Sequence, residues 1–198
     1  AASDVYKRQR LENLIADIDE EMYRKIVENR SVKDKDAKDT AKIVGLSAIK
    51  YGDLSNQATK DYIFDVDRFT SFEGNTGPYI LYTIVRIKSI LNRYVQEGGD
   101  LSTGKILPAV NASEKNLMLQ LSGFAAMVEN AFEEKAPHKI CAYIYEVSNA
   151  FNSFYHETKI LSEEDQAQKE SFLQLLQLTR RVLETSIDLL GFSAPDRM

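Results

Sequence analysis

Cysteine, proline, glycine and tryptophan are scarce in this sequence: among 198 residues there are one, four, nine and none. A single cysteine, Cys141, excludes an internal disulfide. Without a secretory leader, a reducing, cytoplasmic setting is the simplest expectation. Few glycines and prolines count against turn-rich, all-β folds. No apolar run approaches the ~18 residues that a membrane helix needs, so we expect no membrane association.

Motifs for phosphate and metal binding are also missing. No Gly-rich phosphate loop of the G-x-x-x-x-G-K-[ST] or G-x-G-x-x-G kind occurs. The only histidines, His138 and His156, stand at no metal-ligand spacing from each other or from Cys141. Cys141 lies near an apolar helix face, which favours a core residue over a nucleophile. We therefore expect no catalytic residue, no metal site and no cofactor in this chain.

The net charge is −5 and the isoelectric point about 5.2. Phosphate neutralisation needs Lys and Arg, so this balance counts against DNA and against RNA binding over a broad surface. Any RNA site must be a local basic patch.

The chain begins at Ala1 without Met, which suggests a piece of something longer. Residues 1–9 match no pattern and are set aside as a candidate non-native stretch.

Apolar residues recur at three- and four-residue steps along most of the chain, as in amphipathic helices. We expect helices over 10–29, 43–51 (stopped by Gly52), 78–97, 113–121, 125–134, 137–160 and from about 162 to Gly191, with a charged loop and helix start over 31–42. Ser162 followed by Asp165 resembles a capping box for the last of these. Only Tyr62–Phe64 reads as a strand. The fold class is thus mainly α, with an antiparallel helical bundle as its second part.

The helix expected from Pro78 has two faces of different character. Leu81, Ile84, Val85, Leu91 and Val95 share one side, and Tyr79, Tyr82, Arg86 and Arg93 share the other. Tyrosine rings stack on unpaired bases, and arginine stacks or holds phosphate. The alternative is a stripe that packs under another helix with its hydroxyls bonded locally. Spacing alone leaves both open.

The helix expected from Pro137 shows a similar division. Its apolar stripe consists of Ile140, Tyr143, Ile144, Val147, Phe151 and Phe154, with Ser148, Asn152 and Lys159 to one side and Tyr155 at the margin. The amide of Asn152 can read a base edge, and Tyr155 can stack beside it. A solvated polar flank is the alternative. The Leu-rich last helix is typical of core.

Several blocks, in order, resemble the C-terminal part of arginyl-tRNA synthetases. They are residues 48–55 (AIKYGDLS), 62–65 (YIFD), 71–82 (SFEGNTGPYILY), 86–90 (RIKSI), 150–155 (AFNSFY) and 189–198 (LLGFSAPDRM). Together the likeness covers roughly residues 10–198. Two departures are evident: Asp165 to Leu173 lacks the Asp-Ala-Leu-Arg-like tetrad of such bundles, and Asp196 stands where Glu is usual.

The resemblance implies an architecture and a function. Residues 1–72 would be the helical end of a class I catalytic domain, supporting the inner elbow of tRNA. Residues 73–198 would be an anticodon-binding helical bundle. The parent enzyme would join arginine to its tRNA through an arginyl-adenylate, using ATP with Mg. Its signature motifs lie outside this chain, so the chain alone is expected to be inactive. The family is commonly monomeric.

The resemblance also assigns residues to the anticodon loop. The positions on the first bundle helix match Tyr82 and Arg86, with Tyr79 nearby. Tyr155 and the C-terminal Met198 match two further contacts, and Asn152 joins them from the pattern above. The competing interpretation is a helical protein–protein interaction module that uses the Tyr stripe as a hot spot and binds no RNA. It predicts a flat apolar patch where RNA binding predicts positive charge.

Overall fold

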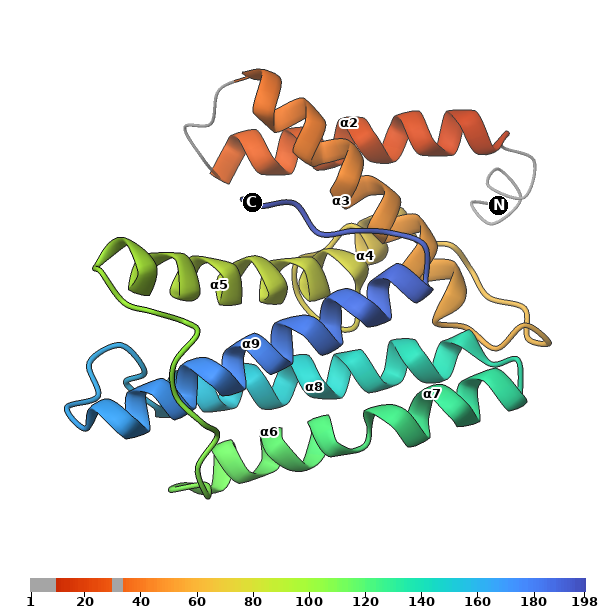
Figure 1. Cartoon of the computed structure of the whole chain (residues 1–198). Coiled ribbons are helices and arrows are strands. Elements are labelled where there is room, and N and C mark those ends of the chain that lie inside the picture. The colour runs from red at the N-terminus through yellow and green to blue at the C-terminus, as the bar shows by residue number, and fades with distance from the viewer. Residues whose placement is uncertain (1–9, 30–33) are drawn as a thin grey trace.

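The computed structural model describes residues 10–29 and 34–198, and helices dominate the described chain (Figure 1). The helices are α2 (Leu11–Asn29), α3 (Asp34–Leu54), α4 (Val66–Phe69), α5 (Gly77–Gln96), α6 (Ala112–Ser122), α7 (Phe124–Glu133), α8 (Pro137–Glu157) and α9 (Gln166–Leu189). No strand occurs within residues 10–29 and 34–198. The expectation of a mainly α fold is therefore confirmed. The expectations for 1–9 and for 31–33 lie outside the described residues, and the rest of the expected charged loop and helix start, 34–42, is helical from Asp34 onward.

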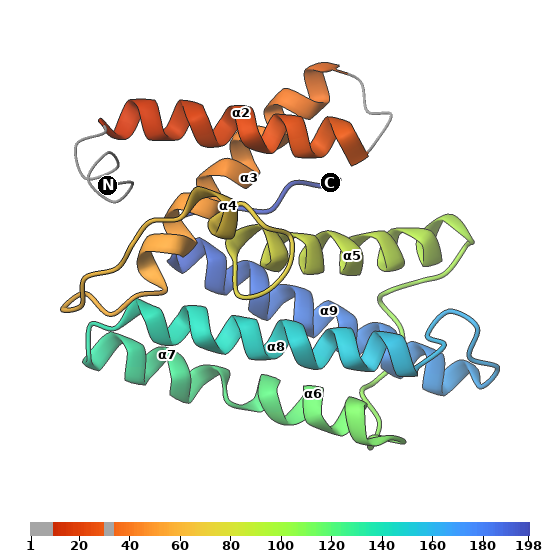
Figure 2. The same cartoon turned by 180° about the vertical axis from the view of Figure 1, so that it is seen from behind.

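The helices form two groups (Figures 1 and 2). α2 and α3 cross each other on one side, and α5 to α9 form a bundle below them. α6 and α7 follow one another in line and lie against α8. α3 continues into the bundle, where wholly buried Tyr51 donates a hydrogen bond to the carbonyl oxygen of Cys141 at 2.8 Å. Cys141 is a buried core residue, as expected.

Sequence and contacts explain the position of α5. The Thr76 hydroxyl accepts a hydrogen bond from the Tyr79 amide at 3.2 Å, and Pro78 occupies the first turn, where its missing N–H costs nothing. Leu81, Ile84, Val85 and Leu91 are buried, as the periodicity predicts. The prediction is wrong for Val95, which is 49% exposed, because the last turn of α5 extends beyond the residues that cover its other turns.

α8 lies across from α5. Its buried stripe includes Ile144, Val147, Phe151 and Phe154, as expected. Ser148, expected on a polar flank, is instead fully buried. The helix ends at Glu157 rather than near residue 160, and an irregular segment over 158–165 leads to α9. This segment, close to the end of α5, forms one wall of a groove described below.

Two glycines, Gly52 and Gly77, allow close approaches between helices. α3 runs through Gly52 to Leu54, so the expected stop at Gly52 is wrong. A Cβ at Gly52 would lie 2.9 Å from Cδ1 of Phe69, which explains why only glycine fits there. A Cβ at Gly77 would meet the backbone of Ser47, so this glycine lets α5 begin directly against α3.

The strand expected at Tyr62–Phe64 is absent; residues 61–65 are irregular. The aromatic residues there pack on Phe69 instead, with ring centroids 6.3 Å away for Tyr62 and 4.6 Å for Phe64. Ile63 between them is 75% exposed. A run of aromatic and β-branched residues gave the strand prediction, but no second strand is present in the described chain to pair with this segment.

The start of α9 also differs from the expected capping box. Asp165, not Ser162, is the N-cap residue, and its carboxylate accepts a hydrogen bond from the Gln168 amide at 3.0 Å. At the other end, Gly191 has a φ of 79° and ends the helix. Lys50 then donates to the carbonyl oxygen of Gly191 at 2.6 Å, and the tail crosses back between α3 and α5 (Figure 1).

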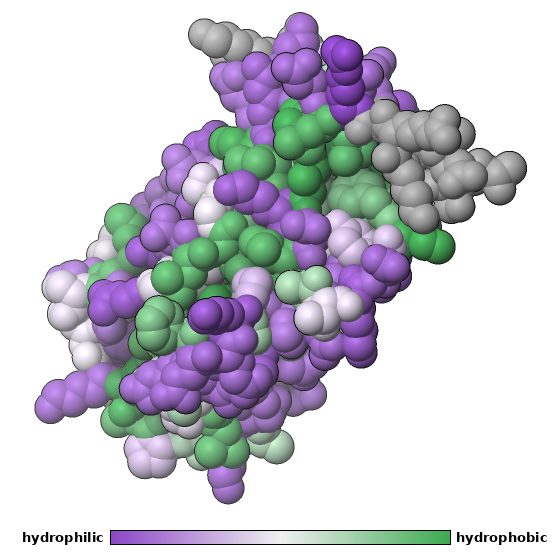
Figure 3. Space-filling view, turned by 90° about the vertical axis from the view of Figure 1, so that its right-hand side faces the viewer, coloured by the Kyte–Doolittle hydropathy of each residue, from purple (hydrophilic) through white to green (hydrophobic). Residues whose placement is uncertain are grey.

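Hydrophilic and hydrophobic residues interleave on the side face in Figure 3, where green side chains are visible between the upper helices and the bundle. No helix built from the described residues has the length and apolar character to cross a bilayer. Nor do three His, Cys, Asp or Glu side chains of the described residues gather as a metal site requires.

Candidate nucleic-acid interface

Five of the six predicted site residues lie on facing sides of α5 and α8. Tyr79, Tyr82 and Arg86 follow one another along α5 at intervals of three and four residues. Asn152 and Tyr155 lie three residues apart on α8. Hydrogen bonds and ring contacts connect all five, and we call them the Tyr–Arg cluster. The faces of α5 and α8 that the periodicity predicted to lie outside the apolar core thus face each other.

A chain of hydrogen bonds orients the arginine. Arg86 donates through Nη1 to Oδ1 of Asn152 at 2.7 Å and through Nη2 to the Tyr82 hydroxyl at 3.1 Å. Asn152 donates through Nδ2 to the Tyr79 hydroxyl at 2.8 Å. The Tyr79 hydroxyl in turn donates to Oδ1 of Asn149 at 2.8 Å. Each partner fixes the next, so the guanidinium is held in one plane with further N–H groups left to donate.

Two aromatic rings flank this guanidinium. The Arg86 Cζ lies 4.7 Å from the ring centroid of Tyr82 and 5.3 Å from that of Tyr155. Phe151 supports Tyr155 from behind, with centroids 6.0 Å apart and planes 24° apart. Tyr82 is 37% exposed and Tyr155 is 38% exposed. A positive, partly exposed, flat-sided surface of this kind suits unpaired bases.

Tyr79 has a supporting position. Its ring meets Tyr145 edge-on at 5.8 Å. Burial raises the pKa of its hydroxyl, and the hydrogen bond from Asn152 acts in the opposite direction. The hydroxyl therefore stays protonated at neutral pH and can both accept from Asn152 and donate to Asn149. Sequence reasoning missed Asn149, although its place three residues before Asn152 on the same helix was a usable signal.

The sixth predicted residue, Met198, takes no part in these hydrogen bonds and ring contacts as far as the described residues show. It is 7% exposed and packs in the hydrophobic core. Lys88 of α5 donates to the carbonyl oxygen of Pro195 at 3.3 Å, which holds the tail along that helix. Both Figure 1 and Figure 2 place the C-terminal end beside the middle of α5. Met198 therefore lies by the helix that carries Arg86, but as a buried side chain.

Charge is unevenly distributed between the helices. α5 carries Arg86, Lys88 and Arg93 and no acidic residue. α2, in contrast, has six acidic and two basic residues. The negative net charge is thus concentrated away from the cluster, and the helix with the exposed tyrosine and arginine is locally basic. A local basic patch on an acidic chain is what RNA binding requires here.

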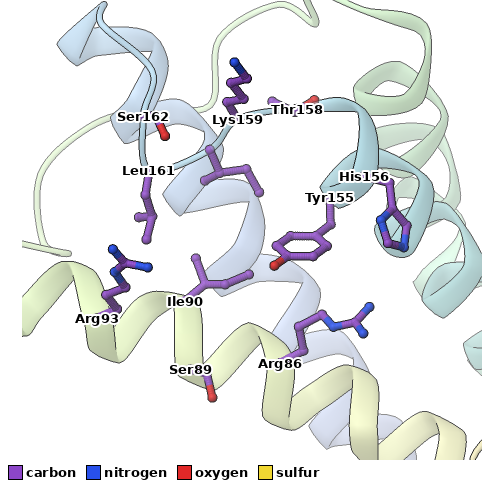
Figure 4. Close-up of a pocket in the computed structure, with 11 residues that line it drawn as sticks. Arg86, Ser89, Ile90, Arg93, Tyr155, His156, Thr158, Lys159, Leu161 and Ser162 are labelled. Carbon is purple, nitrogen blue, oxygen red and sulfur yellow. The ribbon is translucent and has the colours of Figure 1, made fainter.

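A groove continues from the cluster toward the end of α5. It has a volume of about 500 Å³, and its walls come from α5 and from the end of α8 with the segment that follows it (Figure 4). Arg86 and Tyr155 lie at its border with the cluster, and Arg93 lies at its other end.

Comparison with known proteins identifies the class of this all-helical bundle with its basic, aromatic face. The sequence profile of the family described as "DALR anticodon binding domain" matches residues 80–198. The chain therefore belongs to the DALR anticodon-binding domain family, although the tetrad that the resemblance led us to seek near Asp165 is lacking.

The similar proteins given next are all arginine–tRNA ligases, also called arginyl-tRNA synthetases. An arginine–tRNA ligase of Agathobacter rectalis is 65% identical over 197 residues, covering 96% of this chain and 33% of that protein. One from Alkaliphilus oremlandii is 51% identical over 96% of this chain and 32% of that protein. The solved Thermus thermophilus arginyl-tRNA synthetase superposes with a TM-score of 0.87 at 28% identity, over 96% of this chain and 32% of that one. The chain thus spans about a third of the length of the curated relatives it matches.

Proposed function

We propose that this chain recognises arginine tRNA through its anticodon loop, as the C-terminal part of an arginine–tRNA ligase. The observation that carries the proposal is the position of Arg86 between two partly exposed tyrosines, Tyr82 and Tyr155, on a locally basic helix. The names of the relatives support the same substrate.

The cluster suggests separate roles for its members. A loop base stacks on the exposed surface of Tyr82 and Tyr155, and Arg86 uses its free N–H groups on a phosphate or a base edge. The amide of Asn152 already accepts from Arg86 and donates to Tyr79. Its Nδ2 also donates to the Thr83 hydroxyl at 3.5 Å, so its main role is to orient Arg86. Met198 contributes to RNA binding by holding the C-terminal tail beside α5.

The remaining proposals concern the longer protein. Residues 1–72 form the end of the catalytic domain, where α2 and α3 support the inner elbow of tRNA, and 73–198 form the anticodon-binding bundle. The whole enzyme attaches arginine by way of an arginyl-adenylate, in the cytoplasm, as a monomer. ATP and Mg would act in the rest of that enzyme, where the resemblance places the signature motifs.

The test is a binding titration at low ionic strength. The probe is an arginine-tRNA anticodon stem-loop, compared with the same hairpin carrying a changed central anticodon base. Tighter binding to the unaltered hairpin, and a smaller salt dependence for Arg86→Ala by about one phosphate, support anticodon recognition. Equal or absent binding contradicts it and favours a protein partner.

A further inference from the structure

The groove beside the Tyr–Arg cluster combines an apolar centre with charged ends. In Figure 4, Ile90 rises from α5, Leu161 points down from the segment after α8 on one side of it, and the hydroxyl end of Tyr155 lies on its other side. Arg93 directs its guanidinium toward the same space from one end. Lys159 stands at the rim and points outward.

The size and chemistry of the groove suit one kind of ligand. A volume of about 500 Å³ lies within the roughly 300–1,000 Å³ typical of small-ligand sites. An apolar slot with a hydroxyl at one side accepts a flat, polar-edged ring, and a guanidinium at its end accepts a phosphate. A nucleotide has both parts joined.

We propose that this groove is a second nucleotide subsite of the RNA interface, which takes one whole nucleotide of the loop next to the base held at the Tyr–Arg cluster. The base lies between Ile90 and Leu161, the Tyr155 hydroxyl bonds to its edge or its ribose, and Arg93 holds its phosphate. This rests on the proposed function, because the groove opens directly from Arg86 and Tyr155.

Arg93 is available for that role. Its present partner is Glu97, whose carboxylate lies 2.9 Å away. Both side chains are largely exposed, 71% for Arg93 and 55% for Glu97. An exposed ion pair one helical turn apart stabilises a helix little, so a phosphate can take its place at small cost. A second cation, Lys159, stands at the rim of the same groove.

The experiment scans the phosphates of the anticodon hairpin against Arg93. Each loop phosphate is replaced in turn by a neutral methylphosphonate, and the affinities of the wild-type chain and of Arg93→Gln are measured for every hairpin. We expect Arg93→Gln to weaken binding of the unmodified hairpin roughly threefold to tenfold. The salt slope should fall by about 0.7, the value for one phosphate of a single strand. At one methylphosphonate position the variant and the wild type should bind equally.

Controls separate a specific contact from general charge. Arg181→Gln removes an exposed arginine of α9 and should change affinity less than Arg93→Gln. Ser162→Glu adds a carboxylate at the exposed rim of the groove and should weaken binding, whereas Ser122→Glu at the exposed end of α6 should not.

The outcomes also distinguish this inference from the function on which it rests. If Tyr82→Ala loses binding while Arg93→Gln matches the wild type, the groove is not a subsite and the proposed function stands. If Arg93→Gln weakens binding equally at every methylphosphonate position, no single phosphate lies at Arg93 and the inference is overturned. If the wild-type chain binds no hairpin, both are overturned.

Discussion

Asn152 and Arg86 lie on facing helices, and the amide oxygen of Asn152 accepts a hydrogen bond from Nη1 of Arg86 at 2.7 Å. Because the same amide donates to the Tyr79 hydroxyl, its orientation is fixed from behind. The arginine is therefore positioned before any RNA arrives. A positioned cation loses less conformational entropy on binding than a free one.

Substitutions of Asn152 should separate positioning from charge. Asn152→Ala removes the acceptor for Arg86 and should weaken hairpin binding roughly tenfold, the cost of one hydrogen bond to a charged group at its lower end of about 1.5 kcal/mol, with little change in salt slope. Asn152→Asp pairs with Arg86 and neutralises it, so it should weaken binding further and reduce the slope. Asn116→Asp, on the exposed side of α6, adds the same charge elsewhere. If it weakens binding as much as Asn152→Asp does, the effect is not local.

Tyr82 should contribute to binding mainly through its ring. Tyr82→Ala should cost about 1–3 kcal/mol of hairpin binding, the range for one stacked base, whereas Tyr82→Phe keeps the ring and should retain most of the affinity. Since Tyr82 is 37% exposed, thermal unfolding of both variants should resemble that of the wild type. Phe132→Ala, which removes an 82% exposed ring from α7, is the matched control. Equal affinities of Tyr82→Ala and wild type would exclude Tyr82 from the interface.

Much of this cluster was predictable from spacing, and some of it was not. Residues at intervals of three and four share a helix face, which placed Tyr82 with Arg86 and Asn152 with Tyr155. Periodicity within one helix cannot say which faces meet, so the pairing of Arg86 with Asn152 had to come from the structure. Asn149 was missed although it lies three residues before Asn152, on the same helix face.

Two wrong predictions about the fold have a common origin. Gly52 reads as a helix stop in isolation, but the close approach of Phe69 requires a glycine inside the helix. Tyr62–Phe64 reads as a strand because its residue types favour strands, yet the two aromatic side chains pack on the ring of Phe69 rather than in a sheet. In both cases contacts between residues distant in the sequence determine the local structure, and a local sequence pattern carries no information about such contacts.

Glu114 should give the stability of the chain a pH dependence. Its carboxyl group is fully buried, Oε2 accepts from the Val110 amide at 2.8 Å, and Oε1 has no hydrogen-bond partner in the described structure. Burial raises its pKa, partly opposed by the Val110 hydrogen bond. The folded chain thus holds the proton more tightly than the unfolded chain. The protonated carboxyl therefore stabilises the folded chain. This stabilisation is complete below the ordinary glutamate pKa of 4.5 and is lost as the pH rises through the raised pKa of Glu114.

Glu114→Gln removes this titration, and urea unfolding from pH 4 to pH 7 provides the measurement. The free energy of unfolding of the wild type should fall relative to that of Glu114→Gln as pH rises across this window. Glu129→Gln, at an exposed position of α7, controls for loss of a carboxylate at the surface. A constant difference between wild type and Glu114→Gln over the whole range would show that Glu114 titrates alike in both states.

Met198 should matter to folding as well as to RNA binding. Because its side chain is 7% exposed within the core, Met198→Ala should lower the free energy of unfolding by about 2 kcal/mol, the lower end for a buried methionine. Met198→Leu conserves volume and should restore most of that stability. Arg197→Ala, at an exposed neighbour, should change stability little. If Met198→Leu regains stability without regaining hairpin affinity, the methionine itself contacts RNA; if it regains both, Met198 acts by packing the tail beside α5. Unaltered stability of Met198→Ala would mean that the tail is not packed in solution.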